Sequence, residues 1–510
     1  MQIKDCATLL NLDQPTRQRL VADQTEVTSL TPDTRQVQPG GCFVAIKGQH
    51  FDGHAHVQEA IAKGAVFVVV GHPVAASGAV IVQVPDPNQA LAQLSVRFFG
   101  DPSAKLKLFG VTGTNGKTTV THLIQQILNA AATDCGLIGT LAVTGGKQPH
   151  AALNTTPDAY WNQVYLSEME QAGKQACAME VSSIGLSQGR VRGIDFDTAV
   201  FTNLTEDHLD YHKTFADYFE AKALLFEQLG NTYHHGQKVK TAVINIDDPY
   251  GRKLVQRTTA NVLTYGTKGR GDLQATDIRV GADGTHFSLT IAGRRYPVHL
   301  QLMGKFNIYN ALAAFGATYV HGIAPKTIIR ALAKVTGVRG RFEIVPTPEQ
   351  VTVIVDYAHT PDGLENVLQT IASFAQRRVF CVVGCGGDRE AAKRPAMATI
   401  ACQLADEPIF TADNPHTEDP DAIIDQMVDG LDPATYTRLR DRKQAIVYAL
   451  SQAKAKDVVL IAGKGHEDYQ VIGTQKQHFD DVEQVQAYYA AKAASAVSKT
   501  RSVNYFSKNA

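Results

Sequence analysis

The sequence lacks the patterns that indicate disulfide bonds, zinc sites, membrane-spanning segments or a signal peptide. Its seven cysteines are scattered and odd in number, and the absence of any C-x-x-C pair argues against a disulfide framework or a zinc site. No apolar run approaches the roughly 20 residues needed to cross a bilayer. The N-terminus lacks the basic region and long apolar core of a signal peptide. These absences predict a cytoplasmic protein whose cysteines are mostly small core residues.

An excess of charge of one sign is also missing. Lys and Arg total 49 and Asp and Glu total 50, for a net charge of −1. Nucleic-acid and membrane-surface binders usually carry a basic excess, so neither partner is expected. A local basic pocket for a small phosphorylated ligand remains compatible with this balance. At 510 residues, with 44% hydrophobic and 19% charged residues, the chain has the composition of a soluble protein of about three domains.

Apolar runs of strand length alternate with helical periodicity along most of the chain, which predicts an α/β fold with doubly wound parallel sheets. Alternating patterns at residues 285–300 indicate an antiparallel addition to the second sheet. Turn signals at Asp101-Pro102-Ser103 and a Gly/Arg-rich stretch at Thr336–Arg341 mark two boundaries. We therefore expect a small N-terminal α/β domain (1–104), a central domain (105–336), a C-terminal domain (337–495) and a flexible tail (496–510).

The strongest single motif is GVTGTNGKTT at residues 110–119, between a predicted strand and a predicted helix. Glycines allow backbone N–H groups to converge on phosphate oxygens, and Lys117 supplies a positive charge. Val111 stands where the strict motif has its first glycine, so Gly113 makes the turn. The motif predicts an ATP-binding loop rather than an empty turn, although a switch, a kinase and a ligase could all use it. Its candidate ligand-binding residues are Gly113, Thr114, Asn115, Gly116, Lys117, Thr118 and Thr119.

Further motifs follow in a fixed order along the chain. They are NTTP (154–157), MEVSS (179–183), NLTEDHLDYH (203–212), YFEAKALLF (218–226), GKFNIYNALAA (304–314), GRFE (340–343), DYAHTPD (356–362), GCGGDRE (384–390), DNPHTEDP (413–420) and GKGHEDYQ (463–470). Together with the phosphate loop they closely resemble the Mur ligase family. The resemblance extends from about Ser29 to Gln470 and therefore covers nearly the whole chain.

This resemblance implies a fold and a reaction. It implies an N-terminal domain for a UDP-sugar, a central domain with a P-loop ATPase-like parallel sheet, and a Rossmann-like C-terminal domain for an amino acid. The implied reaction is ATP-dependent amide formation through an acyl phosphate. The motifs are most similar to those of members that add a diamino acid to the D-glutamate of UDP-MurNAc-L-Ala-D-Glu during peptidoglycan synthesis. A monomer is expected.

The resemblance also assigns catalytic and metal-binding roles. Glu180 and His208 match two Mg²⁺ ligands of the family, alongside the Thr118 hydroxyl, while Lys117 contacts phosphate. Lys222 matches a lysine that the family carbamylates to N6-carboxylysine, an anion able to hold Mg²⁺. From the residues alone, a glutamate at a strand end is more often a solvated cap and a lone histidine more often structural. A lysine on an amphipathic helix is normally a solvated cation, so only the resemblance supports the carbamate.

The remaining candidate residues are carried over by motif. For the nucleotide they are Asn307, Asn310, Arg341, Asp356 and His359, with a helix cap as the alternative role for Asn310. For the UDP-sugar they are Thr34, Gln49, His50 and Phe51, where Asp33-Thr34-Arg35 replaces the family's usual Asp-Ser-Arg. For the muramoyl-dipeptide they are Asn154, Thr155, Thr156, Ser182, Gln188 and Arg190.

The identity of the added amino acid depends on a second motif. Members that take meso-diaminopimelate typically carry D-N-P-R, whereas this chain has Asp413-Asn414-Pro415-His416. Histidine is shorter than arginine and cannot form its bidentate fork with a carboxylate. Three further residues match the diaminopimelate pattern, namely Arg389, Gly463 and Glu467. meso-Diaminopimelate is therefore slightly favoured over L-lysine, and His416 could instead be a loop residue without substrate contact.

Two other functions remain open from the sequence. A folylpolyglutamate-type ligase shares the phosphate loop and the carbamylated lysine but lacks the UDP-sugar domain, so the Ser29–His54 region disfavours it. A catalytically inactive ATP-binding scaffold is disfavoured because Lys117, Glu180, His208 and Lys222 are all present.

Overall fold

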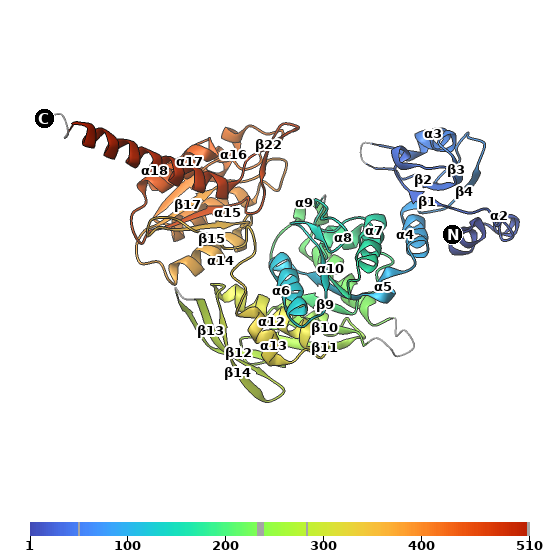
Figure 1. The fold of residues 1–510 in the computed structure, drawn as a ribbon, viewed down its shortest axis with the longest axis horizontal. Helices are drawn as coiled ribbons and strands as arrows, with labels where there is room; N and C mark the ends of the chain where they lie inside the picture. The colour runs from blue at the N-terminus through green and yellow to red at the C-terminus, as the bar shows by residue number, and fades with distance from the viewer. Residues whose placement is uncertain (49–50, 153, 232–238, 282–283, 507–510) are drawn as a thin grey trace.

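A computed structural model describes residues 1–48, 51–152, 154–231, 239–281 and 284–506, with the backbone alone described from residue 495 onward. Three sheets follow one another along the chain and lie in three separate bodies (Figure 1). Each body has its own apolar core, so each satisfies the physical requirement for a domain.

The N-terminal body is built on a four-stranded parallel sheet in the order β1-β2-β3-β4. Phe43 and Phe67 on its middle strands are fully buried, because helices cover both faces of the sheet. Its strands are β1 (Ser29–Thr31), β2 (Gly41–Val44), β3 (Ala65–Val70) and β4 (Val80–Gln83). Its helices are α1 (Ile3–Leu9), α2 (Gln14–Leu20), η1 (Thr34–Gln36), η2 (Gly53–His56), α3 (Val57–Ala62) and α4 (Pro87–Phe98), and the short α5 (Pro102–Lys105) that follows contacts the central body.

The central body has a ten-stranded sheet in the order β14-β13-β12-β11-β10-β9-β5-β8-β6-β7. Its middle is parallel, and β13 and β14 add antiparallel strands at one edge as the alternating sequence predicts. Its strands are β5 (Lys107–Thr112), β6 (Cys135–Ile138), β7 (Val143–Thr144), β8 (Ala176–Glu180), β9 (Thr198–Phe201), β10 (Thr241–Asn245), β11 (Asn261–Gly266), β12 (Leu273–Gly281), β13 (Gly284–Ile291) and β14 (Arg294–Leu300).

Helices cover both faces of this sheet. Helices α6 and α12 pack against each other within one large apolar cluster, and the 15-residue α12 is buried over most of its length because the sheet and two helices surround it. The helices are α6 (Lys117–Ala130), α7 (Ala159–Gln171), α8 (Ser183–Ser187), α9 (Leu209–His212), α10 (Phe215–Leu229), α11 (Pro249–Leu254), α12 (Lys305–Tyr319) and α13 (Pro325–Leu332).

The C-terminal body contains a six-stranded sheet in the order β15-β16-β20-β17-β18-β19, parallel except for β15. Its strands are β15 (Glu343–Val345), β16 (Thr352–Asp356), β17 (Val379–Val383), β18 (Glu407–Phe410), β19 (Thr437–Arg438) and β20 (Val458–Ala462), and a hairpin of β21 (Tyr469–Ile472) and β22 (Gln475–His478) follows. Its helices are α14 (Pro361–Ala372), α15 (Lys393–Leu404), α16 (Pro420–Val428), η4 (Pro433–Thr435), α17 (Arg442–Gln452) and α18 (Asp481–Phe506).

The motifs occupy the carboxyl ends of the parallel strands. The phosphate loop follows β5, Glu180 ends β8, Asp356 ends β16, and residues 384 and 463 follow β17 and β20. Ligands of open α/β sheets bind at this edge. The expected α/β fold class is therefore confirmed, while the domain boundaries remain predictions.

The end of the chain differs from its sequence-based description. Helix α18 continues through residues 496–506, where the sequence predicts a flexible tail, and in Figure 1 its last part extends away from the C-terminal body. Whether this segment is flexible remains a prediction. Among the described residues, none of the helices combines the length and apolarity needed to span a membrane.

Candidate active site

The phosphate loop joins β5 to α6. Gly113 has a φ of 144°, and a Cβ there would lie 1.9 Å from Thr202 Oγ1. Gly116 has a φ of 89°, and its Cβ would lie 2.4 Å from Asn310 Oδ1. Both positions therefore require glycine. Lys117 Nζ donates to two loop carbonyls at 2.9 and 2.8 Å, at the N-terminus of a helix whose N–H groups favour an anion.

Glu180 lies beside this loop with its side chain fully buried. Its Oε2 accepts hydrogen bonds from Thr118 Oγ1 at 2.8 Å and from Thr140 Oγ1 at 3.1 Å. Its Oε1 accepts from Thr140 N at 2.7 Å. Arg341, which precedes the C-terminal sheet, donates from Nη2 to Thr118 Oγ1 at 3.0 Å. A carboxylate and a hydroxyl thus meet beside the phosphate loop, and these are oxygen donors of the kind that Mg²⁺ prefers.

Lys222, on α10, is buried on the other side of the loop. Its side chain is 1% exposed, and its Nζ donates to the Gly113 carbonyl at 2.9 Å, the same oxygen that accepts from Lys117. The ammonium lies 4.5 Å from the centroid of the Tyr218 ring. Burial, and then the charge of Lys117, lowers the pKa of Lys222 well below its usual value. The site therefore favours the neutral amine.

His208 completes this group. It has a left-handed φ of 56° immediately before α9, and its Nε2 lies 3.4 Å from Asp207 Oδ2. Burial lowers the pKa of His208, the Asp207 carboxylate opposes this effect, and the positive charge of Lys117 adds to it. Neutral imidazole is the form that binds a metal. The loop, α9 and α10 therefore bring together the charged groups that the sequence analysis selected from four separate motifs.

A cavity of about 390 Å³ lies between the central and C-terminal bodies. Six residues expected at the nucleotide line it, namely Asn115, Gly116, Thr119, Asn310, Arg341 and Asp356. The lining also contains residues that the sequence motifs did not single out: Thr202, Asn203, Thr205, Asn245, Lys305, Phe306, Tyr309, Tyr357, Ala358, Asp362, Gly363, Asn366 and Val367. Phe306 and Tyr309 could have been found, because they are aromatic residues within the GKFNIYN motif.

Other expected nucleotide residues support the cavity or lie elsewhere. Asn307 accepts from Asn310 Nδ2 at 3.0 Å and so orients that side chain. Asp356 accepts from Phe342 N at 2.6 Å, and burial raises its pKa to about 6 despite the charge of Arg341. His359 lines a second cavity, and burial lowers its pKa to about 4.

This second cavity, of about 430 Å³, also lies between the central and C-terminal bodies. Ten residues from the sequence analysis line it: Asn154, Thr155, His208, His359, Arg389, Asp413, Asn414, His416, Gly463 and Glu467. Pro415 does not. The residues missed are Ile184, Asp207, Asp210, Tyr357, Gly384, Cys385, Gly386, Glu390, Lys393, Tyr469 and Val471. Several of these residues belong to motifs that the sequence revealed. Which of their side chains face the cavity depends on how the central and C-terminal bodies pack together, and a sequence motif does not show that.

The loops at the C-terminal side of this second cavity are held by close backbone contacts. Gly463 has a φ of 112°, and a Cβ there would lie 2.5 Å from Asp413 Oδ2. His416 has a left-handed φ of 50° and donates from its backbone N to the Val471 carbonyl at 3.1 Å. Burial and the nearby Asp413 carboxylate raise the pKa of Glu467. The loop of residues 413–416 is therefore joined to the β21–β22 hairpin along this side of the cavity.

Tyr357 lines both cavities and forms part of the partition between them. The Arg341 guanidinium lies 4.5 Å from the centroid of its ring. The rings of His359 and His466 lie 4.6 and 4.9 Å from it, centroid to centroid. Aromatic and cationic groups thus fix the Tyr357 ring from several directions.

The residues expected to contact the muramoyl-dipeptide are linked to the end of β8. Thr156 Oγ1 donates to the Glu180 carbonyl at 3.0 Å and lies 3.0 Å from Ser182 Oγ. Arg190 donates to the Thr156 carbonyl and to Gln188 Oε1, both at 2.9 Å. This network ties the expected dipeptide residues to the strand that carries the buried carboxylate. Thr155 Oγ1 accepts from Thr140 Oγ1 at 3.0 Å and links Asn154-Thr155 to the same network.

The expected UDP-sugar residues lie on the N-terminal body. Thr34 is buried, and its carbonyl accepts from Lys63 Nζ at 3.1 Å. Phe51 is half exposed and stacks on His56 with 4.7 Å between ring centroids. Gln49 and His50 lie outside the described residues. The structure keeps these groups on a different body from the two cavities (Figure 1).

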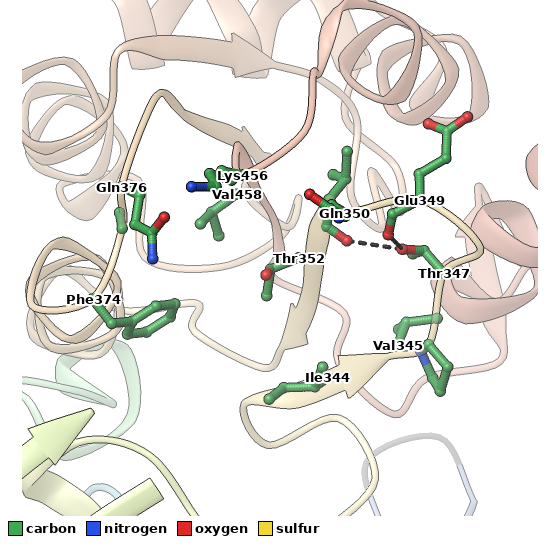
Figure 2. A pocket seen from close by; sticks show the side chains of 13 residues that line it. Ile344, Val345, Thr347, Glu349, Gln350, Thr352, Phe374, Gln376, Lys456 and Val458 are labelled. Carbon is green, nitrogen blue, oxygen red and sulfur yellow. Dashed lines mark hydrogen bonds between the residues drawn. The ribbon is translucent and has the colours of Figure 1, made fainter. Parts of the chain in front are cut away.

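A third cavity, of about 450 Å³, lies on the C-terminal body and is shown in Figure 2. It is lined by Ile344, Thr352 and Phe374, among others, and by a loop in which Thr347 Oγ1 donates to two carbonyls at 2.8 Å. Thr352 begins β16, whereas Asp356 ends it. This cavity therefore lies at the amino ends of the strands, away from the edge where such sheets bind ligands.

Comparisons with known proteins match the chain throughout its three bodies. Family models described as "Mur ligase family, catalytic domain", "Mur ligase middle domain" and "Mur ligase, glutamate ligase domain" match residues 26–99, 111–318 and 340–465. A Lactiplantibacillus plantarum protein named UDP-N-acetylmuramoyl-L-alanyl-D-glutamate–2,6-diaminopimelate ligase is 53% identical, covering 92% of this chain and 94% of its own. A Bacillus cereus protein of the same name is 47% identical over 90% of this chain and 93% of its own.

Two solved structures with a similar fold are also Mur ligases. One described as a UDP-N-acetylmuramoyl-L-alanyl-D-glutamate–2,6-diaminopimelate ligase has a TM-score of 0.67 and 32% identity, covering 97% of this chain and 99% of its own. An ADP complex of the MurF ligase from Thermotoga maritima shares the fold, with a TM-score of 0.66 at 19% identity, over 91% of this chain and 97% of its own. Because matches of such identity extend over nearly the whole length of both chains, the chain belongs to the Mur ligase family.

Proposed function

We propose that this Mur ligase adds meso-diaminopimelate to the D-glutamate of UDP-MurNAc-L-Ala-D-Glu with hydrolysis of ATP to ADP and phosphate. The observation that carries the proposal is the pair of cavities at one interface, one beside the phosphate loop and one beside Asn414 and Glu467. The γ-carboxylate oxygen attacks the γ-phosphorus of ATP, and ADP leaves. The amine then attacks the acyl carbon, and phosphate leaves with the acyl–oxygen electron pair to give an amide.

The first half of the reaction brings two anions together, so cations must stabilise the developing charge. Lys117 would hold the β- and γ-phosphates, and Arg341, which reaches Thr118 from the C-terminal side, would contact the γ-phosphate. The buried Thr118 hydroxyl and Glu180 carboxylate, together with the His208 imidazole, would form the donor set for Mg²⁺. Bound there, Mg²⁺ would neutralise charge on the transferred phosphoryl group.

Lys222 is proposed to act as its carbamate. A neutral amine adds to the carbon of CO₂ and loses a proton, so a lysine whose pKa is lowered by burial suits this modification. The product is an anion next to Lys117, whose charge it would partly balance. Its oxygens would add to the donor set formed by Glu180 and His208.

The second cavity is proposed to hold the diamino acid. Glu467 and Asn414 offer an acceptor and a donor for its distal end, and Arg389 offers a cation for a carboxylate. The curated relatives named as 2,6-diaminopimelate ligases favour meso-diaminopimelate over L-lysine. His416 replaces the arginine of the usual motif, so the distal carboxylate is held here without that bidentate contact.

The N-terminal body is proposed to bind the UDP-sugar near Thr34 and Phe51, with the dipeptide reaching the central body at Thr155 and Arg190. The names of the curated relatives indicate a UDP-linked precursor as their substrate, and we propose on that basis that the enzyme works in the cytoplasm.

The test is phosphate release from ATP in the presence of Mg²⁺ and UDP-MurNAc-L-Ala-D-Glu. Parallel reactions contain meso-diaminopimelate, L-lysine or no amino acid, and mass spectrometry identifies the product. We expect turnover with meso-diaminopimelate and a product heavier by one diaminopimelyl group. Turnover with L-lysine alone would overturn the assigned amino acid, and turnover with neither would overturn the ligase function in favour of an inactive ATP-binding protein.

A further inference from the structure

Lys464 is a buried cation directly beneath the second cavity. It follows Gly463 at the end of β20, and its side chain is 0% exposed. Its Nζ donates to Asn414 Oδ1 and to Glu467 Oε2, both at 3.1 Å, and to the Tyr469 carbonyl. A protonated lysine has three N–H donors, and all three find acceptors here. The site thus provides what a buried ammonium requires in order to stay charged.

Its two side-chain partners both line the cavity. Asn414 Oδ1 also accepts from Val471 N at 3.0 Å, which fixes the amide so that Asn414 Nδ2 donates to Glu467 Oε2 at 2.7 Å. Oε2 of Glu467 is therefore occupied by two donors. Within the described part of the chain no group donates to Oε1 of Glu467, so this oxygen is the one available to a ligand's ammonium.

The charge of Lys464 changes what the cavity offers. Asp413 and Glu467 both line the cavity, and the pKa of Glu467 is raised by burial and by Asp413 but lowered by Lys464. With Lys464 present, the Lys464–Glu467 pair has no net charge. Without it, Glu467 would be an unbalanced anion that prefers a net cation.

The two candidate substrates differ in this respect at their distal ends. The distal end of meso-diaminopimelate carries an ammonium and a carboxylate and is neutral overall. The distal end of L-lysine carries an ammonium alone and has a charge of +1. A neutral ion pair suits the first, because the ligand's ammonium can meet Glu467 while its carboxylate does not face an unbalanced charge on Glu467.

We propose that Lys464 is a positioning residue that sets the amino-acid specificity, by orienting Asn414 and Glu467 and cancelling the charge of Glu467 so that a zwitterionic distal end is accepted. This inference rests on the proposed function. It assigns to a residue under the cavity part of the discrimination that the missing arginine at position 416 would otherwise supply.

The first test compares the wild type with Lys464→Met, which keeps the length of the side chain but removes its charge. kcat and KM are measured for meso-diaminopimelate and for L-lysine. The KM for meso-diaminopimelate is expected to rise about tenfold or more, the scale of one lost charged hydrogen bond, with a smaller change in kcat. The ratio of kcat/KM for meso-diaminopimelate to that for L-lysine is expected to fall about tenfold. A ratio within twofold of the wild type would overturn the proposal.

A matched control removes a buried lysine elsewhere. Lys240 is 3% exposed and donates to the Phe196 carbonyl at 2.7 Å, in the central body and away from both cavities. Lys240→Met is expected to lower stability while leaving the ratio between the two amino acids unchanged. If the ratio moved as far in this variant as in Lys464→Met, a general loss of packing would explain both and the proposal would fail.

A second measurement decides the matter even if Lys464→Met does not fold. The double variant Lys464→Met/Glu467→Gln lacks both buried charges and therefore leaves neither of them unpaired. It is compared with Glu467→Gln alone, which keeps the charge of Lys464. In Glu467→Gln alone the unbalanced charge of Lys464 should disfavour L-lysine, whose distal end has a charge of +1, so the ratio of kcat/KM for meso-diaminopimelate to that for L-lysine should be higher than in the double variant, where both charges are absent. Ratios that agree within twofold would overturn the proposal. A wild type that turns over neither amino acid would instead refute the proposed function, which separates the two failures.

Discussion

Glu180 offers the sharpest test of the proposed metal site. Its carboxylate accepts three hydrogen bonds, two from Thr140 and one from Thr118. In Glu180→Gln the amide oxygen can keep the bond from Thr140 N, and the two hydroxyl groups can rotate to accept from the new NH₂ group. All three contacts can then be kept without their charge assistance, which costs ~1 kcal/mol of folding free energy. The charge beside the phosphate loop disappears entirely, and kcat should fall by about 10²–10³, or ~2.7–4 kcal/mol of barrier.

The assay is phosphate release as a function of Mg²⁺ concentration, with urea unfolding measured on the same samples. The variant should unfold near the wild-type midpoint, release phosphate slowly, and need more Mg²⁺ to reach half of its own maximum. Glu168→Gln is the control, because Glu168 pairs with His150 at 2.8 Å and lines neither cavity. A Glu180→Gln enzyme that keeps more than a third of kcat with unchanged Mg²⁺ dependence would refute the assignment.

Three further predictions follow from the same geometry. Lys222→Ala should lose at least about 10² of kcat, and added short carboxylic acids should restore part of the phosphate release, because they can occupy the space of the carbamate; unaffected turnover would exclude that role. His416→Arg should raise the ratio of kcat/KM for meso-diaminopimelate to that for L-lysine, because a guanidinium can pair with the distal carboxylate. An unchanged ratio would show that residue 416 does not contribute to the selectivity. Burial raises the pKa of Asp356 to about 6, above ~3.9 in the unfolded chain, so the folded state takes up the proton first as pH falls. The wild type should therefore gain stability relative to Asp356→Asn between pH 7 and pH 5, and urea midpoints that move in parallel would contradict this.

Local patterns predicted the fold well where the deciding contacts are close in sequence. The phosphate loop and α6 follow from glycines and a helical repeat within one short segment, and β12–β14 pair as the alternation at residues 285–300 indicates. The end of the chain was harder to predict, because the small, polar residues of 496–506 gave no packing signal for the helix that α18 forms there.

The sequence predicted which motifs contribute to the site, but not which side chains line each cavity. The sequence selected residues in both cavities, yet it missed Lys464, because a lysine between glycines is expected in solvent. Its burial depends on Asn414, 50 residues earlier in the chain. His359 was expected at the nucleotide but lines the other cavity, a distinction that depends on how two separate sheets face each other.

Tyr357 lines both cavities, so its phenol ring is part of the wall that they share. A nucleophile that comes from the amino-acid side must pass this ring to reach a carboxyl group activated on the nucleotide side, so the position of the ring limits access to the intermediate. The ring also constrains inhibitor design. A compound that joins an adenosine analogue to an amino-acid analogue must have a linker that passes around the edge of the Tyr357 ring. Linker length and curvature, more than the affinity of either half, would then limit how tightly such a compound binds.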